Sequence, residues 1–131
     1  MSGGLKILAV DDEQAQLGDL ARLLRSAPGV ADVQCASDGR EALVKASRQP
    51  FDAIFLDVRM PDLDGLELSR VLRRFSSPPQ VVFVTAHETA AVEAFELRAL
   101  DYLLKPVGRG RLEEALERVR AAVAASTPPP R

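Results

Sequence analysis

Five polar side chains of this 131-residue chain stand directly after apolar runs, and their types suit metal binding and group transfer. Carboxylates follow two of the runs, a hydroxyl follows a third and an ammonium follows a fourth. If these runs are strands of a parallel sheet, their carboxyl ends meet at one edge, where such sheets bind ligands. The five residues are Asp11, Asp12, Asp57, Thr85 and Lys105.

The chemistry open to this set is metal-assisted phosphoryl transfer. Three carboxylates brought together repel one another, so the pKa of one must rise unless a cation joins them. Mg²⁺ is the natural cation, because it binds a few carboxylate oxygens and keeps several waters. Thr85 and Lys105 could then hold phosphoryl oxygens. Asp57 directly follows the apolar residues Ala53–Leu56 of a central run, which makes it the candidate nucleophile for an aspartyl phosphate.

Strands and helices are predicted to alternate along the chain. Three of the runs are apolar at nearly every position, which is typical of parallel strands covered by helices on both faces. Between the runs, apolar residues recur at three- and four-residue spacings, as on one face of a helix. Five strand–helix units predict a doubly wound α/β fold. The expected strands are Leu5–Val10, Val30–Ala36, Phe51–Leu56, Val81–Val84 and Asp101–Leu104.

Local signals mark the helices. Asp38 is the expected N-cap of the second helix, with Glu41 completing a capping box. The turn-rich segment Pro61–Gly65 precedes the third helix, and we interpret Asp62 and Asp64 as turn or cap residues. The expected apolar helix positions are Leu17, Leu20, Ala21 and Leu24, then Ala42, Leu43 and Ala46, then Leu68, Val71, Leu72 and Phe75, then Ala90–Leu97, and finally Leu112, Leu116, Val119 and Val123.

Composition and charge exclude several functional classes. Hydrophobic residues make up 47% and charged residues 27%, the balance of a soluble globular domain and not of a disordered chain. The net charge of -2 argues against nucleic-acid binding by phosphate neutralisation. No apolar run approaches the roughly 20 residues of a membrane span, and Met1–Gly4 lacks the basic start of a signal peptide. Cys35 is the only cysteine, which fits a reducing cytoplasmic compartment without disulfides.

Four motifs together resemble the receiver domain of two-component response regulators. They stand at four strand ends in that family's order and spacing, and the likeness extends over residues 5–124. The resemblance implies a flavodoxin-like (βα)5 fold, in which helices cover both faces of a five-stranded parallel sheet. The motifs are Val10-Asp11-Asp12-Glu13, Phe55 to Gly65, Val84-Thr85-Ala86 and Asp101 to Pro106.

The resemblance assigns a role to each acidic residue of the site. It implies that Asp57 accepts a phosphoryl group from a sensor histidine kinase. Asp12 and Asp57 would bind Mg²⁺ through their side chains, and Arg59 would bind it through its backbone carbonyl. Asp11 is expected to act mainly through metal-bound water. The domain would be a switch, enzyme-like only in promoting its own phosphorylation and dephosphorylation.

The resemblance also assigns the residues that respond to phosphorylation. Thr85 and Lys105 would contact the phosphoryl group, and Tyr102 would be the rotameric partner of Thr85. The family usually has a cis peptide bond at the position of Lys105 and Pro106. The surface expected to respond, and to mediate homodimerisation, comprises residues 87–97, 101–104 and 112–123.

Two further residues are candidates for tuning the lifetime of the aspartyl phosphate. Arg59 stands two residues after Asp57, and His87 stands two residues after Thr85. Those positions line the access route to the phosphoryl group in this family.

A finer resemblance concerns the output of the domain. The segment Ala94 to Pro106, with Arg98 where many receivers have glycine, is most like the receivers of LytTR-type transcriptional regulators. We therefore expect residues 1–4 to be an N-terminal extension and residues 5–124 to be the receiver. Residues 125–131 would begin a Pro-rich linker to a DNA-binding domain outside this chain, so this domain itself would bind no nucleic acid.

Other functions fit the sequence less well or remain open. A phosphatase of the haloacid dehalogenase kind needs a second acid two residues after the nucleophile, where this chain has Arg59. A flavodoxin-like FMN binder needs a neutral phosphate loop after the first strand, where Asp11, Asp12 and Glu13 would repel phosphate. The open alternative is a stand-alone receiver that acts as a phosphorelay or protein-binding module.

Overall fold

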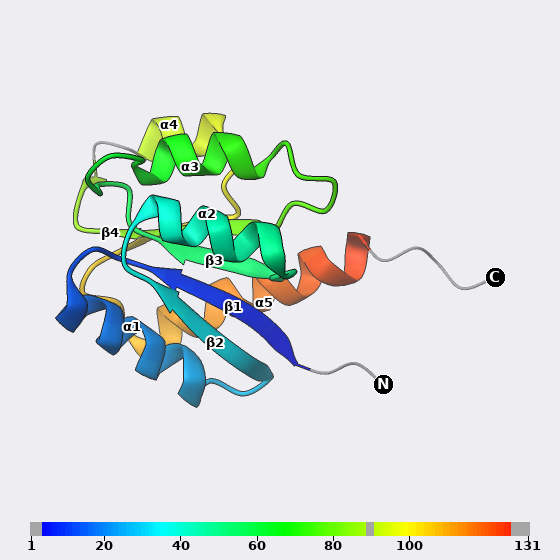
Figure 1. Cartoon of the computed structure of the whole chain (residues 1–131). Coiled ribbons are helices and arrows are strands. Elements are labelled where there is room, and N and C mark those ends of the chain that lie inside the picture. The colour runs from blue at the N-terminus through cyan, green and yellow to red at the C-terminus, as the bar shows by residue number, and fades with distance from the viewer. Residues whose placement is uncertain (1–3, 89–90, 127–131) are drawn as a thin grey trace.

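The chain forms one parallel β-sheet with helices on both faces (Figure 1). We describe it from a computed structural model, which covers residues 4–88 and 91–126. The strand order β2-β1-β3-β4-β5 confirms the predicted doubly wound α/β fold. The strands are β1 (Leu5–Val10), β2 (Val30–Ala36), β3 (Ala53–Leu56), β4 (Gln80–Thr85) and β5 (Asp101–Leu104). The helices are α1 (Gln14–Ser26), α2 (Gly39–Arg48), α3 (Gly65–Leu72), α4 (Ala91–Glu96) and α5 (Arg109–Ser126).

Some expectations concern residues that lie outside the described part of the chain. These are residues 1–3 of the expected N-terminal extension, residue 90 of the fourth helix and residues 127–131 of the expected linker. Among the described helices, none is both long enough and apolar enough to cross a membrane.

The strand residues divide between two apolar layers, one on each face of the sheet. Phe55 packs in the layer that α1 and α5 complete, whereas Ile54 and Leu56 pack in the layer that α2, α3 and α4 complete (Figure 1). All three side chains are fully buried. Because both faces are covered, consecutive strand residues are apolar, and each large side chain contributes about 1.5–3 kcal/mol on burial.

Strand β3 begins two residues later than expected, because a side chain replaces the first backbone contact. The Lys6 amide donates to the Asp52 carboxylate at 2.8 Å, while the Asp52 amide donates to the Lys6 carbonyl at 2.8 Å. The chain at Asp52 is therefore already paired with β1, although it is not yet regular strand. Strand β4 is one residue longer than expected at each end.

Only one of the two hydrogen bonds of the capping box predicted for α2 is present. Asp38 caps the helix as expected, since its carboxylate accepts from the Glu41 amide at 2.8 Å. The Glu41 carboxylate instead accepts from the amide and hydroxyl of Ser37, one residue before the cap. A complete capping box occurs at α3, where Asp64 and Glu67 bond to each other's backbone amides.

Asp101, the first residue of β5, anchors α5 to the edge of the sheet. Its buried carboxylate accepts two hydrogen bonds from Arg111, at 2.7 and 3.0 Å, and pairs with Arg118 at 3.2 Å. Burial raises the pKa of Asp101, but the bonds from Arg111 and the Tyr102 amide and the charge of Arg118 outweigh it, so the pKa lies below its ordinary value. This stabilisation is complete above the ordinary pKa of aspartate and is lost as pH falls through the lowered one.

We expect Asp101→Asn to lower the free energy of unfolding at neutral pH by about 1–3 kcal/mol, a range that allows for the partial exposure of both arginines. Urea denaturation measured across pH should show a constant difference from wild type down to about pH 5 and a shrinking one below about pH 4, as the wild-type carboxylate is protonated. Asp19→Asn, which breaks an exposed pair with Arg22, is the matched control. Equal effects of the two substitutions would refute the anchoring role.

Candidate functional site

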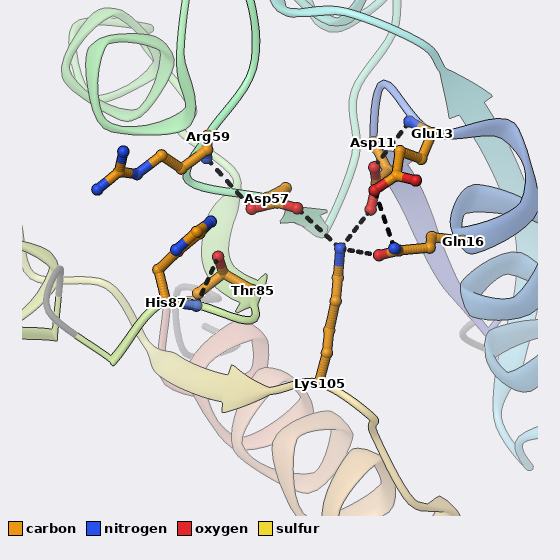
Figure 2. A network of polar contacts seen from close by, with 8 residues as sticks. All are labelled: Asp11, Glu13, Gln16, Asp57, Arg59, Thr85, His87 and Lys105. Atoms are coloured by element: carbon orange, nitrogen blue, oxygen red, sulfur yellow. Dashed lines mark hydrogen bonds and ion pairs between the residues drawn. The ribbon is translucent and has the colours of Figure 1, made fainter.

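Backbone pairing beyond the strand ends brings the polar residues together. The Asp57 amide donates to the Val10 carbonyl at 3.2 Å, so the residue after β3 lies beside the end of β1. The Lys105 amide donates to the Thr85 carbonyl at 2.9 Å, so the residue after β5 lies beside the end of β4. The sheet order thus delivers a carboxylate pair and a hydroxyl–ammonium pair to one edge (Figure 2).

Lys105 joins the two halves of this site. Its ammonium donates to one oxygen of Asp11 at 2.7 Å and to one oxygen of Asp57 at 2.8 Å. The side chains of Lys105, Asp11 and Asp57 are 18%, 3% and 11% exposed. One positive charge therefore forms ion pairs with two buried carboxylates, so the cluster has an excess of one negative charge.

The surroundings of Lys105 favour its protonated, charged form. Burial lowers the pKa of Lys105, but its hydrogen bonds and ion pairs with Asp11 and Asp57 outweigh burial, so the pKa lies above its ordinary value. A pKa raised on folding means that the ammonium stabilises the fold fully below the ordinary lysine pKa of 10.5 and that this stabilisation is lost as pH rises through the higher value.

A backbone amide fixes the second oxygen of each carboxylate. The Glu13 amide donates to Asp11 at 2.9 Å, and the Arg59 amide donates to Asp57 at 3.2 Å. In both cases the donor lies two residues after the acceptor, as in an Asx turn. Each carboxylate is therefore oriented with one oxygen on its own loop and the other on Lys105 (Figure 2).

Thr85 and Tyr102 contact the same backbone residue from two sides. The fully buried Thr85 hydroxyl accepts from the His87 amide at 3.3 Å. The Tyr102 hydroxyl donates to the His87 carbonyl. The backbone of His87 therefore links the end of β4 to β5, while its side chain is exposed.

Two of the remaining expected site residues have exposed side chains. Asp12 and the Arg59 side chain are exposed. Within residues 4–88 and 91–126, no three acidic, histidine or cysteine side chains gather in an arrangement that could hold a metal ion. The peptide bond between Lys105 and Pro106 is cis.

Two contributors to the site were missed from the sequence. The Gln16 side-chain oxygen is a third acceptor for the Lys105 ammonium. Gly65 lies so close to the loop of Asp57 that a Cβ atom there would stand 2.2 Å from the Asp57 carbonyl oxygen. The sequence signal for Gln16 is its place in the first turn of the helix that follows Asp11. For Gly65 the sequence predicts only a turn residue.

A family model gives this site its context. The model of the response regulator receiver domain matches residues 7–117. The chain belongs to this family. As a receiver domain of a two-component response regulator it is a signalling protein, and its Asp11, Asp57, Thr85 and Lys105 lie at the carboxyl ends of β1, β3, β4 and β5.

Two relatives of this receiver domain are regulatory proteins. It is 40% identical over 120 residues to the transcriptional regulatory protein LytR of Staphylococcus aureus, covering 92% of this chain and 49% of that protein. It is 41% identical over 131 residues to the positive alginate biosynthesis regulatory protein of Pseudomonas aeruginosa, covering 96% and 53%. The chain spans about half the length of the curated relatives it matches.

Solved structures agree with this assignment. The response regulatory domain of protein mrkE from Klebsiella pneumoniae is 35% identical, with a TM-score of 0.85 and coverage of 93% of this chain and 100% of that one. The Vibrio cholerae chemotaxis protein CheY4 is 32% identical, with a TM-score of 0.80 and coverage of 88% and 98%. The receiver domain therefore has the flavodoxin-like fold that the motifs implied.

Proposed function

We propose that this receiver domain accepts a phosphoryl group from a histidine kinase on Asp57. The observation that carries the assignment is the difference between the two carboxylates that share Lys105. The Asp57 side chain is 11% exposed and the Asp11 side chain 3%, so Asp57 is the more accessible nucleophile. One oxygen of Asp57 accepts from the Lys105 ammonium, whose charge also suits the negative charge that phosphorylation brings.

The reaction needs no further covalent participant from this chain. A carboxylate oxygen of Asp57 attacks the phosphorus, and the bond from phosphorus to the donor breaks with its electron pair leaving on the donor. Lys105 pairs with the resulting phosphoryl oxygens, and the Thr85 hydroxyl donates to one of them. Beyond this promotion of its own phosphorylation and dephosphorylation, the domain is not an enzyme.

The carboxylate pair fits a small divalent cation. One ammonium lies within 2.8 Å of an oxygen of Asp11 and of an oxygen of Asp57, so a single cation can serve both groups. We assign Asp12 and Asp57 as side-chain ligands of Mg²⁺, Arg59 as a carbonyl ligand and Asp11 as a ligand through water. Bound Mg²⁺ would neutralise charge on the phosphoryl oxygens and the attacking carboxylate.

The backbone of His87 is our candidate for the link from phosphorylation to the surface. When Thr85 turns its hydroxyl toward a phosphoryl oxygen, the hydrogen bond from the His87 amide is weakened. Tyr102 holds the His87 carbonyl, so the rearrangement reaches β5 directly. The Arg59 and His87 side chains lie on the side of Asp57 away from Lys105 (Figure 2), where they would tune access of water to the aspartyl phosphate.

We propose that the output is homodimerisation through α4, β5 and α5. Val92 and Phe95 lie three residues apart on one face of α4 and are 69% and 84% exposed, and Leu104 at the end of β5 is 43% exposed. Burial of these apolar side chains against a second copy is favourable.

The relatives support transcription as the final output. Both proteins named above are regulators about twice as long as the matched segment. We therefore propose a cytoplasmic regulator that binds DNA through a LytTR-type domain outside this chain. A stand-alone receiver that relays phosphate or binds another protein is the second candidate, and the length of the full gene distinguishes the two.

Incubation with a small-molecule phosphodonor and Mg²⁺ should add one phosphoryl group, measured by intact mass. The adduct should be absent without Mg²⁺ and absent in Asp57→Asn, because that variant lacks the attacking oxygen. Asp52→Asn, which changes the aspartate at the opposite end of β3, should still be phosphorylated. An adduct that persists in folded Asp57→Asn would contradict the assignment of the acceptor.

Sedimentation velocity of the phosphorylated protein should show a dimer that Phe95→Glu weakens at least about 10-fold, because it places a charge at the centre of the apolar surface. Val44→Glu, which alters an exposed apolar residue on α2, is the matched control and should leave dimerisation unchanged. Undiminished dimerisation of Phe95→Glu would count against this surface.

A further inference from the structure

Lys105 has a third partner that its proposed phosphoryl role does not require. Its ammonium donates to the side-chain oxygen of Gln16 in the first turn of α1. The Gln16 amide nitrogen donates to the Glu13 carboxylate at 2.9 Å, which orients the amide with its oxygen toward Lys105. The Glu13 backbone amide in turn bonds to Asp11, so these four residues form a closed ring (Figure 2).

This ring uses the full donor capacity of the lysine. An ammonium has three N–H donors, and those of Lys105 are directed at Asp11, Asp57 and Gln16. Gln16 is half-buried, and its amide nitrogen is held by the Glu13 carboxylate. The third acceptor therefore favours the one position of the ammonium that also satisfies both carboxylates.

Lys105 also lines a groove on the surface of the domain. It measures about 770 Å³ and lies between α1 and the segment that follows β5. Gln16, Lys105 and Pro106 line it, together with Leu20 and Leu23 of α1. Lys105 therefore borders open space on the side of α1, and loss of the Gln16 contact would free its ammonium to move into that space.

We propose that Gln16 is a positioning residue that holds the Lys105 ammonium between Asp11 and Asp57 and thereby weakens Mg²⁺ binding at those carboxylates. The inference rests on the proposed function, because it assigns the same carboxylate site to Mg²⁺. Gln16 sets how much Mg²⁺ the resting domain requires before it can be phosphorylated. It acts only through Lys105 and touches no reacting atom.

The test is the dissociation constant of Mg²⁺, measured by isothermal titration calorimetry on the whole chain. Gln16→Met keeps the length and helix propensity of the side chain but removes the acceptor. It should bind Mg²⁺ about 3- to 10-fold more tightly than wild type, because a hydrogen bond to a charged group opposes binding in the wild type. Gln14→Met, an exposed position of the same helix, is the matched control and should bind as wild type does.

A double-mutant cycle separates this role from a direct effect on the metal. In a Lys105→Met background, Gln16→Met should leave Mg²⁺ affinity unchanged, because the ammonium that it positions is gone. An effect of the same size in that background would overturn the proposal. Gln16→Ala, with its unfolding measured alongside, repeats the cycle if the methionine variant does not fold.

The remaining outcomes distinguish this inference from the proposed function. Wild-type protein that binds Mg²⁺ and is phosphorylated, with Gln16→Met and Gln14→Met equal in affinity, overturns the role of Gln16 alone. Wild-type protein that binds no Mg²⁺ contradicts the proposed function and overturns this inference with it. In phosphorylation assays, Gln16→Met should be faster than wild type at low Mg²⁺ and equal to it at saturating Mg²⁺.

Discussion

The site depends on one lysine that holds two buried carboxylates together. Asp11 and Asp57 repel each other and lose hydration in the same small volume, which is costly unless a cation lies between them. Lys105, which follows β5, supplies that cation. Its ammonium lies 2.7 Å from an oxygen of Asp11 and 2.8 Å from an oxygen of Asp57. Under the proposed function, Lys105 supplies this neutralising charge in the resting domain, before Mg²⁺ and a phosphoryl group bind.

The strand order is what makes this possible. Strands β1 and β3 are neighbours, which puts Asp11 beside Asp57, and strands β4 and β5 are neighbours, which puts Thr85 beside Lys105. The Lys105 side chain extends from the second pair of strands to the two carboxylates that follow the first pair. The His87 backbone, bonded to Thr85 and Tyr102, connects the end of β4 to β5. Under the proposed function, a change at Asp57 would reach β5 through this backbone residue.

Much of this arrangement was predictable because it follows from patterns that act locally. Apolar runs specify buried parallel strands, and polar residues directly after them must meet at one edge. The errors have equally local causes. Asp52 pairs with β1 through its side chain and so delays β3, and Glu41 reaches Ser37 because an amide one residue before the cap is also within range. Gln16 was missed because a long side chain's partner depends on packing that spacing does not reveal. The left-handed backbone of Arg98, with φ of 60°, was likewise invisible in a residue type that rarely adopts it.

The measurement that tests the central interaction most directly is an NMR pH titration of the Lys105 side chain. The chain has three lysines, Lys6, Lys45 and Lys105, so the Lys105 Cε resonance can be assigned by its loss in Lys105→Met. The account predicts a pKa of Lys105 above the ordinary lysine value in wild type, and a lower pKa in the Asp11→Asn, Asp57→Asn double variant, because both stabilising charges are gone. A wild-type Lys105 that loses its proton at or below the ordinary pKa, or that titrates identically in the double variant, would contradict the account.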